Sequence, residues 1–423
     1  MCGQAEEKHE FHVMAKPVGA ECNLKCGYCF YLEKEAILSP KKKSCMSDEV
    51  LETYVREYIT SQDAHEISFV WQGGEPMLAG LDFYRKAIRL QKKYARHGKN
   101  ITNALQTNGT LLNDEWCLFL AENSFIVGIS LDGPKDVHDR YRVDRGGKPT
   151  FDRVMNGIKL LKKYGVEFNV LACVTRESSG RAVEIYRFFK NAKIDFIQFT
   201  PLVERLPNAA AENLGLHYAV PPVLNEKEPH EQVTSFSVRP EAWGEFMIAV
   251  FDEWVRNDVG STWVMNFESA LANWMKLAPA SCVFGKHCGR STIIEHNGDI
   301  YSCDHYVYPE YRLGNVLDNQ LEELINSEKQ IEFGECKETM LPETCRECEV
   351  LFACRGECPK HRFSHTWNGE PGLNYLCNGY RNFFRHIHPY MKGMAQLINV
   401  GVPADRIMDA VDAPLVVQLV DRH

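Results

Sequence analysis

The sequence predicts an α/β protein, with a partial barrel of six βα units followed by a smaller cysteine-rich domain. From Phe11 to about Val203, short apolar segments alternate with amphipathic ones, which is typical of parallel strands and their connecting helices. After Ser281 the character changes, and nine of the sixteen cysteines fall between Cys282 and Cys377. A chain of 423 residues is long enough for a large catalytic domain and a smaller second one.

Six segments have the short, apolar character of buried parallel strands. They begin at Phe11, Ile67, Ile101, Phe125, Val166 and Phe196. Between them lie stretches with apolar residues three or four positions apart, which predict helices. The clearest are DEVLETYVREYI from Asp48, DFYRKAIRLQKKYA from Asp82 and FDRVMNGIKLLKKY from Phe151. Six such units predict a parallel barrel that is only partly closed.

Composition divides the chain into four parts. We expect residues 1–240 to hold the barrel and a polar, proline-rich connection that begins at Glu204. Residues 241–280 are expected to form a helical linker, and residues 281–380 a domain built around cysteines. A last amphipathic helix and a tail are expected over residues 381–423.

Composition and charge exclude several classes of function. The 48 Lys and Arg face 57 Asp and Glu, and no dense basic stripe is present, so nucleic acid is not an expected partner. The N-terminal residues are charged where a signal peptide is apolar, and no apolar run is long enough to span a bilayer. We therefore expect a cytoplasmic protein that does not bind membranes. Cysteines stay reduced in that compartment, so metal or cluster ligation is expected rather than disulfides.

Three cysteines directly after the first predicted strand, Cys22, Cys26 and Cys29, form a CxxxCxxC run. Three thiolates on one loop suit three irons of a cubane cluster and leave the fourth iron open to a ligand. The alternative is a zinc site or three unrelated thiols. Zinc prefers four ligands with paired CxxC spacing, and no partner pair lies nearby in the sequence.

The loops after four predicted strands are expected to meet at one rim, because the carboxyl ends of parallel strands lie at the same edge. The cysteine loop follows the first strand, GGEP (73–76) the second and TNG (107–109) the third, while residues 130–133 close the fourth. GGEP alone is a tight turn, for which a structural role is as reasonable as a binding one. The guanidinium of Arg142 can clamp a carboxylate with two parallel hydrogen bonds, although a surface position suits an arginine equally well.

Eight cysteines of the second region make two sets of four. They are Cys282, Cys288, Cys303, Cys345, Cys348, Cys354, Cys358 and Cys377. Two four-thiolate sets fit two further iron-sulfur clusters or two structural zinc ions, and spacing alone leaves both open. Asp304 directly follows Cys303, so a cluster ligand here would hold a carboxylate that can accept a proton from a thiol or hydroxyl. An exposed turn residue is the plainer interpretation of Asp304.

CNLKCGYC resembles the signature of the radical S-adenosylmethionine superfamily, and the C-terminal cysteine spacing resembles the SPASM domain. WQGGEPMLAG, LQTNGTLL, GISLDGPKDVHDRYR and CDHYVYPEYRLGN extend the resemblance over almost the whole chain to the anaerobic sulfatase-maturating enzymes. The resemblance implies a radical S-adenosylmethionine partial barrel, a C-terminal SPASM domain and three 4Fe-4S clusters. It also implies that the open iron chelates S-adenosylmethionine, which one electron cleaves to a 5′-deoxyadenosyl radical.

The resemblance further implies a role for each candidate residue. Cys22, Cys26 and Cys29 would hold the open cluster; Cys282, Cys288, Cys303 and Cys358 an inner auxiliary cluster; and Cys345, Cys348, Cys354 and Cys377 an outer one. Contacts to S-adenosylmethionine are implied for Tyr28, Gly74, Ser130, Arg142 and Val203. Asp304 is the implied proton acceptor, and Tyr31 is a candidate for contact with a peptide.

In this family a cysteine or serine inside a newly made sulfatase is oxidised to Cα-formylglycine. The resemblance implies that the radical takes a hydrogen from the substrate Cβ, that Asp304 takes the thiol or hydroxyl proton, and that an electron leaves through the inner cluster. The expected partners are an unfolded or nascent sulfatase polypeptide and an electron donor such as flavodoxin or ferredoxin. The resemblance also implies a monomer.

Two other functions are considered. A maturase of ribosomally made peptides that forms thioether or carbon-carbon links is disfavoured, because many such enzymes have an N-terminal leader-binding domain and the first strand here begins near Phe11. A non-catalytic electron carrier or zinc-built binding module would need neither a three-cysteine cluster with an open iron nor GGEP beside it.

Overall fold

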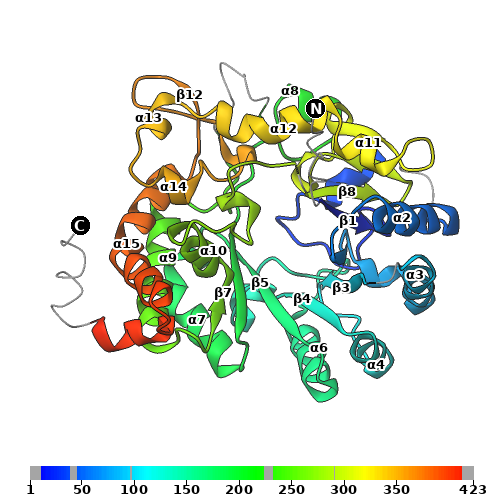
Figure 1. Cartoon of the computed structure of the whole chain (residues 1–423), viewed down its shortest axis with the longest axis horizontal. Helices are drawn as coiled ribbons and strands as arrows, with labels where there is room; N and C mark the ends of the chain where they lie inside the picture. The colour runs from blue at the N-terminus through cyan, green and yellow to red at the C-terminus, as the bar shows by residue number, and fades with distance from the viewer. Residues whose placement is uncertain (1–10, 39–44, 96–97, 223–231, 290, 412–423) are drawn as a thin grey trace, which may run out of the picture.

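A ten-stranded sheet forms the body of the protein in the computed structural model, which describes residues 11–38, 45–95, 98–222, 232–289 and 291–411 (Figure 1). The strands are β1 (His12–Lys16), β2 (Glu66–Trp71), β3 (Asn100–Thr107), β4 (Phe125–Ser130), β5 (Phe168–Val174), β6 (Phe196–Pro201), β7 (Trp263–Val264), β8 (Ser291–Glu295), β9 (Asp299–Tyr301) and β10 (Arg312–Asn315). Their order across the sheet is β10-β9-β8-β1-β2-β3-β4-β5-β6-β7. All neighbouring pairs from β8 to β7 are parallel, and β8, β9 and β10 pair antiparallel. The six predicted strands are confirmed as β1 to β6.

The sequence did not predict the four other strands of this sheet. β7 has two residues, too few to give a pattern. β8 pairs with β1 in parallel over five residues, from His12 opposite Ser291 to Lys16 opposite Glu295. The boundary expected at residue 281 stays a prediction, but the chain beyond it adds three strands to the edge of the barrel sheet. The two parts of the chain therefore share one hydrogen-bonded sheet.

Helices follow most of the strands along the chain, and others belong to the cysteine-rich region. The described helices are α1 (Glu35–Leu38), α2 (Asp48–Thr60), α3 (Leu81–Tyr94), α4 (Asp114–Glu122), α5 (Lys135–Asp139), α6 (Phe151–Tyr164), α7 (Ala182–Asn191), α8 (Ala209–Asn213), α9 (Pro240–Asn257), α10 (Met265–Trp274), α11 (Leu321–Ile325), α12 (Glu328–Thr339), α13 (Glu343–Arg346), α14 (Leu351–Cys354) and α15 (Cys377–Asn399). Figure 1 shows α2, α3, α4 and α6 in succession outside the strands, and α9 beside α15. The long helices predicted from Asp48, Asp82 and Phe151 are confirmed.

Short 3-10 turns and one small hairpin complete the described structure. The turns are η1 (Leu32–Lys34), η2 (Pro76–Ala79), η3 (Ser178–Arg181), η4 (Cys282–Phe284), η5 (Asp304–Tyr306), η6 (Pro309–Tyr311), η7 (Pro359–His361) and η8 (Ala404–Ala410). The hairpin pairs β11 (Ser364–His365) with β12 (Pro371–Leu373). Among the described residues, no helix combines the length and apolarity needed to cross a membrane.

Burial alternates along the strands, so one face of the sheet is closely packed and the other is only partly covered. In β2, Ile67, Phe69 and Trp71 are buried, while Ser68 and Val70 between them are only half-buried. Side chains alternate between the two faces of a strand, so the buried set packs against the outer helices and the other set faces the inside of the barrel. The inner face is the side on which the strands leave room for a ligand.

Helices α9 and α15 approach closely through two glycines. A Cβ on Gly379 would lie 2.0 Å from the carbonyl oxygen of Pro240, and one on Gly244 would lie 2.6 Å from the carbonyl oxygen of Gly379. Only residues without a Cβ allow the two backbones to come this near. Because α15 begins at Cys377, this crossing fixes the position of that cysteine.

Candidate active site

The three-cysteine loop follows β1 and is held by the segment after β4. The backbone N–H groups of Lys25 and Gly27 donate to the carbonyls of Val143 (2.8 Å) and Tyr141 (3.0 Å). Arg145 Nε donates to the Cys22 carbonyl at 2.7 Å. These contacts bind the three-cysteine loop to the segment after β4, so the backbone that carries the cysteines is held in place.

The GGEP loop after β2 packs directly on the same loop. The N–H of Gly74 donates to the Gly19 carbonyl and that of Glu75 to the Glu21 carbonyl, both at 2.8 Å. A Cβ on Gly74 would lie 2.0 Å from the Glu21 carbonyl oxygen, so only glycine fits at this contact. GGEP thus has a structural role here, and its expected contact with a cofactor stays a prediction.

Glu75 joins the loops after β2 and β3. Its buried carboxylate accepts hydrogen bonds from the hydroxyl of Thr107 (2.7 Å) and the backbone N–H groups of Asn108 (2.9 Å) and Met77 (3.1 Å). Burial raises the pKa of Glu75 to about 7, against the effect of these three donors. The sequence indicated the GGEP turn but no separate role for Glu75, although a glutamate between GG and P in an apolar stretch was a signal.

Asn108 links the loop after β3 to the three-cysteine loop. Its Nδ2 donates to Asn23 Oδ1 at 2.8 Å and lies 3.8 Å from Cys22 Sγ. The amide of Asn23 in turn donates to the hydroxyl of Thr110 at 2.9 Å. The loops after β1, β2 and β3 therefore form one hydrogen-bonded unit, as expected for loops that meet at the carboxyl ends of parallel strands.

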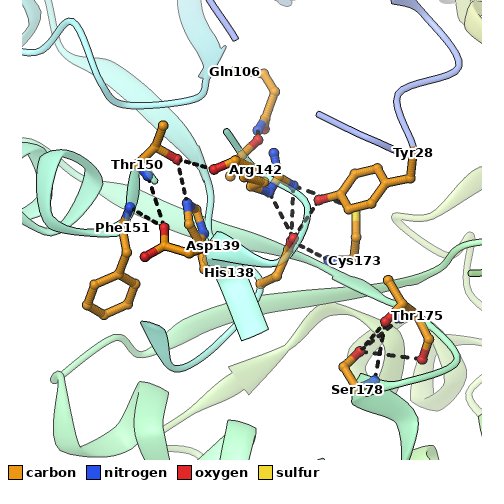
Figure 2. Close-up of polar contacts among 12 residues, drawn as sticks. Tyr28, Gln106, His138, Asp139, Arg142, Thr150, Phe151, Cys173, Thr175 and Ser178 are labelled. Atoms are coloured by element: carbon orange, nitrogen blue, oxygen red, sulfur yellow. Dashed lines mark hydrogen bonds and ion pairs between the residues drawn. The ribbon is translucent and has the colours of Figure 1, made fainter. Parts of the chain in front are cut away.

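Arg142 is buried at this rim and already holds a carboxylate. Its Nε and Nη2 donate to the two oxygens of Asp132 at 2.9 and 3.0 Å, and the hydroxyl of Tyr28 and the N–H of Cys173 also donate to Asp132. Figure 2 shows that Tyr28, Arg142 and Cys173 lie close together. Arg142 thus forms two parallel hydrogen bonds with a carboxylate, but this carboxylate belongs to the protein itself. A cofactor carboxylate would have to bind the other edge of the guanidinium.

The turn that carries Arg142 is itself braced by buried polar groups (Figure 2). The hydroxyl of Thr150 donates to the Arg142 carbonyl at 2.7 Å and lies 3.1 Å from Nε2 of His138. Burial lowers the pKa of His138 to about 4, so its ring is neutral at neutral pH. Asp139 accepts from the N–H groups of Thr150 and Phe151 at 2.9 and 2.8 Å.

The two other residues expected to contact S-adenosylmethionine lie near this rim. Ser130 ends β4, and its hydroxyl accepts from Gln106 Nε2 at 3.4 Å. Val203 is buried two residues beyond the end of β6. Their contacts with a cofactor stay predictions.

The thiols of the first loop suit a bound cation. Burial raises the pKa of Cys22 and Cys26 to about 12, and Cys29 adds to the rise in both. Thiols this hard to ionise become thiolates only beside positive charge, which cluster irons supply. Three such groups on one loop match the donor set of a cluster with one open iron.

The second region brings its cysteines into two groups. Burial raises the pKa of Cys358 well above its usual value, and the nearby thiols of Cys282, Cys288 and Cys303 add to this rise. The other four line one cavity of about 350 Å³ at the surface. They are Cys345, Cys348, Cys354 and Cys377. These are the two groups implied by the family resemblance, and their cluster assignment stays a prediction.

Among the described residues, no three His, Cys, Asp or Glu side chains converge closely enough to bind a single metal ion.

Asp304 lies on η5 and reaches β1 from the second region. Its carboxylate forms an ion pair with the buried ammonium of Lys16, the last residue of β1. Burial acts to raise the pKa of Asp304, but Lys16 and His305 outweigh it, and the pKa lies below its ordinary value. The carboxylate is therefore ionised, and its expected role as a proton acceptor stays a prediction. The sequence did not indicate Lys16, although a lysine that ends an apolar strand was a signal.

Tyr31 belongs to the same buried group. Its hydroxyl donates to Glu295, the register partner of Lys16 on β8, and the Lys16 ammonium lies 4.3 Å from its ring centre. Tyr31 is thus engaged with the protein itself, and its expected contact with a peptide stays a prediction.

Comparison with known proteins agrees with this arrangement. A model of the radical SAM superfamily matches residues 17–189, and a model of SPASM, an iron-sulfur cluster-binding domain, matches residues 282–349. The chain is 49% identical over 408 residues to the serine-type anaerobic sulfatase-maturating enzyme of Bacteroides thetaiotaomicron, covering 96% of this chain and 97% of that protein. The chain belongs to the anaerobic sulfatase-maturating enzymes.

Two further relatives of this maturating enzyme are informative. The cysteine-type anaerobic sulfatase-maturating enzyme of Clostridium perfringens (strain 13) is 34% identical to this chain. The aligned region covers 91% of this chain and 98% of that protein. The solved structure of native anSMEcpe with bound AdoMet and Kp18Cys peptide superposes with a TM-score of 0.79, at 33% identity over 92% of this chain and 99% of that one. The expected family and fold class are confirmed.

Proposed function

We propose that this enzyme oxidises a serine or cysteine in the active-site motif of a sulfatase to Cα-formylglycine, using S-adenosylmethionine and three 4Fe-4S clusters. The observation that supports it most is the ion pair between Asp304 and Lys16. It joins an ionised acceptor from the second region to the strand whose loop carries Cys22, Cys26 and Cys29. Oxidation of a hydroxyl or thiol to a carbonyl or thiocarbonyl needs such an acceptor close to the site of hydrogen abstraction.

The cysteine sets are assigned by the family resemblance together with their grouping. Cys22, Cys26 and Cys29 would hold the cluster that binds S-adenosylmethionine, and the remaining eight would hold the inner and outer auxiliary clusters. When bound, these groups supply a 5′-deoxyadenosyl radical that abstracts hydrogen and an acceptor for the electron left on the substrate.

The protein's own residues supply position and proton transfer. Asp304 accepts the substrate proton, so the side chain loses one hydrogen atom, one proton and one electron, a two-electron oxidation. Lys16 fixes the carboxylate of Asp304. Arg142, through Asp132, fixes Tyr28 inside the three-cysteine loop. A serine gives the aldehyde directly, whereas a cysteine gives a thioaldehyde that water hydrolyses.

We further propose that serine is the preferred target residue, because the serine-type relative is 49% identical to this chain and the cysteine-type relative 34%. We also propose a nascent or unfolded sulfatase as substrate, flavodoxin or ferredoxin as electron donor, a monomeric enzyme and a cytoplasmic location. The relative of known structure that binds the Kp18Cys peptide supports a peptide substrate.

The test is an anaerobic assay of the reconstituted enzyme with S-adenosylmethionine, a reductant and matched peptides that differ only in serine or cysteine at the target position. Asp304→Asn keeps the shape of the side chain but removes its charge, and should lower formylglycine formation by on the order of 10²-fold while 5′-deoxyadenosine still forms. Asp318→Asn, at an exposed position of the same region, is the matched control. Peptide that is only cross-linked, or unchanged formylglycine formation in Asp304→Asn, would contradict the proposal.

A further inference from the structure

Lys337, on α12, is a fully buried lysine whose ammonium is bound by one cysteine-bearing loop. Its Nζ donates to the carbonyl oxygens of Cys282 (2.6 Å), Val283 (2.9 Å) and Gly285 (2.6 Å). Three acceptors require three N–H donors, and a neutral amine has only two. Lys337 is therefore charged, and its charge lies against the loop that carries the first cysteine of the inner set.

A second buried cation, Arg362, holds the neighbouring cysteine loop in the same way. Its Nε and Nη2 donate to the carbonyls of Gly356 (2.9 Å) and Arg355 (3.0 Å), between an outer-set cysteine and an inner-set cysteine. Nη1 donates to the carbonyl of Lys337 itself. The two cations thus form a layer of positive charge against the auxiliary cysteines, with Lys337 on the inner side.

The acceptors of both side chains, within the described part of the chain, are backbone carbonyls rather than carboxylates. Carbonyl dipoles satisfy the hydrogen bonds of a buried cation without adding the opposite net charge that a carboxylate partner would bring. A cubane with four thiolate ligands carries net negative charge, which increases on reduction. A fixed cation nearby therefore favours the reduced form, and does so strongly in a site with little water.

The two cations differ in which cysteine-bearing backbone they bind. The Lys337 ammonium donates to carbonyls of the loop that begins at Cys282 of the inner set. The Arg362 guanidinium donates to carbonyls of residues 355 and 356, which follow Cys354 of the outer set directly. The charge of Lys337 therefore lies against the inner set.

We propose that Lys337 is a positioning residue whose fixed positive charge raises the reduction potential of the inner auxiliary cluster relative to the outer one. The proposal rests on the proposed function and extends it, because the substrate radical must give up one electron after Asp304 has taken its proton. A raised potential makes the inner cluster the better acceptor of that electron.

The test is a redox titration of the anaerobically reconstituted full chain, with the auxiliary clusters followed by electron paramagnetic resonance. Lys337→Met removes the charge and the donors, Lys337→Gln removes the charge but keeps amide donors, and Lys337→Arg keeps the charge. Lys329→Met, an exposed lysine on the same helix that donates to the Arg312 carbonyl at 2.8 Å, is the matched control.

We expect Lys337→Met and Lys337→Gln to retain their iron and to shift one auxiliary midpoint potential in the negative direction, with the other unchanged. Lys337→Arg and Lys329→Met should match the unmodified enzyme. Unchanged potentials in the Met and Gln variants, or equal shifts of all clusters, would overturn the proposal. Loss of inner-cluster iron in both would overturn it too, since Lys337 would then only anchor the loop. Because the potentials are measured without substrate, failure of formylglycine formation would count against the proposed function alone.

Discussion

The three-cysteine loop and the outer cysteine set hold their thiols in opposite ways. Cys22, Cys26 and Cys29 lie within one short loop, whose backbone is bonded to GGEP and to the segment after β4. The outer set is gathered from α13, α14 and the start of α15 around a surface cavity. The first site thus depends on loop-to-loop contacts at the barrel rim, and the second on how distant helices pack. Each can be disturbed without the other.

Gly74→Ala should give the largest effect, confined to the first site. The new Cβ would meet the Glu21 carbonyl at 2.0 Å, and backbone cannot yield as a side-chain tip can. Displacing the loop should reduce 5′-deoxyadenosine formation by on the order of 10²-fold, the scale for a misplaced reacting group. Auxiliary iron content should stay unchanged. Gly180→Ala, where nothing lies within 4 Å of the new Cβ, is the control. Equal activity of both variants would show that the packing of GGEP on the loop is not needed.

Gly379→Ala should act on the outer site instead. Its Cβ would lie 2.0 Å from the Pro240 carbonyl, so α15 must move away from α9 and take Cys377 with it. Overpacking of this kind costs about 1–3 kcal/mol of the free energy of unfolding. Iron analysis should report the loss of one cluster, with cleavage of S-adenosylmethionine retained. In Gly393→Ala, on the same helix, the new Cβ meets only the flexible tip of Ile407, so iron content should not change. A full iron complement in Gly379→Ala would contradict this account.

The smallest of these effects concerns Glu75 and pH. Its pKa, raised by burial to about 7, lies above the ordinary 4.5, so the folded state binds more protons than the unfolded state between these values. The free energy of unfolding should therefore fall as pH rises through this window, by at most about 1.4 kcal/mol per pH unit. Glu75→Gln cannot ionise and should lack this component. Thermal unfolding of both chains from pH 4.5 to 7 measures the difference. If stability changed with pH in the same way in both, Glu75 would not have the raised pKa, and this account would be wrong.

The sequence predicted what depends on local pattern. Strands β1 to β6 and the long helices follow from apolar periodicity, and the cysteine sets follow from spacing together with family resemblance. The ion pair between Lys16 and Asp304 joins residues 288 positions apart, and no local pattern indicates which strand ends face each other. Arg142 was expected to bind a carboxylate through two hydrogen bonds, but the sequence could not show that Asp132 already accepts these bonds. Lys337 has no signal at all, since a lysine in a polar helix is normally exposed.

The parallel pairing of β8 with β1 has a consequence for how the protein can be divided. A chain cut before β8 would leave the five residues of β1 with bare N–H and C=O groups along one side. Such an unpaired edge is a template for association with other chains. The barrel is therefore not expected to persist as a well-behaved fragment, and neither half can hinge away from the other without breaking the sheet.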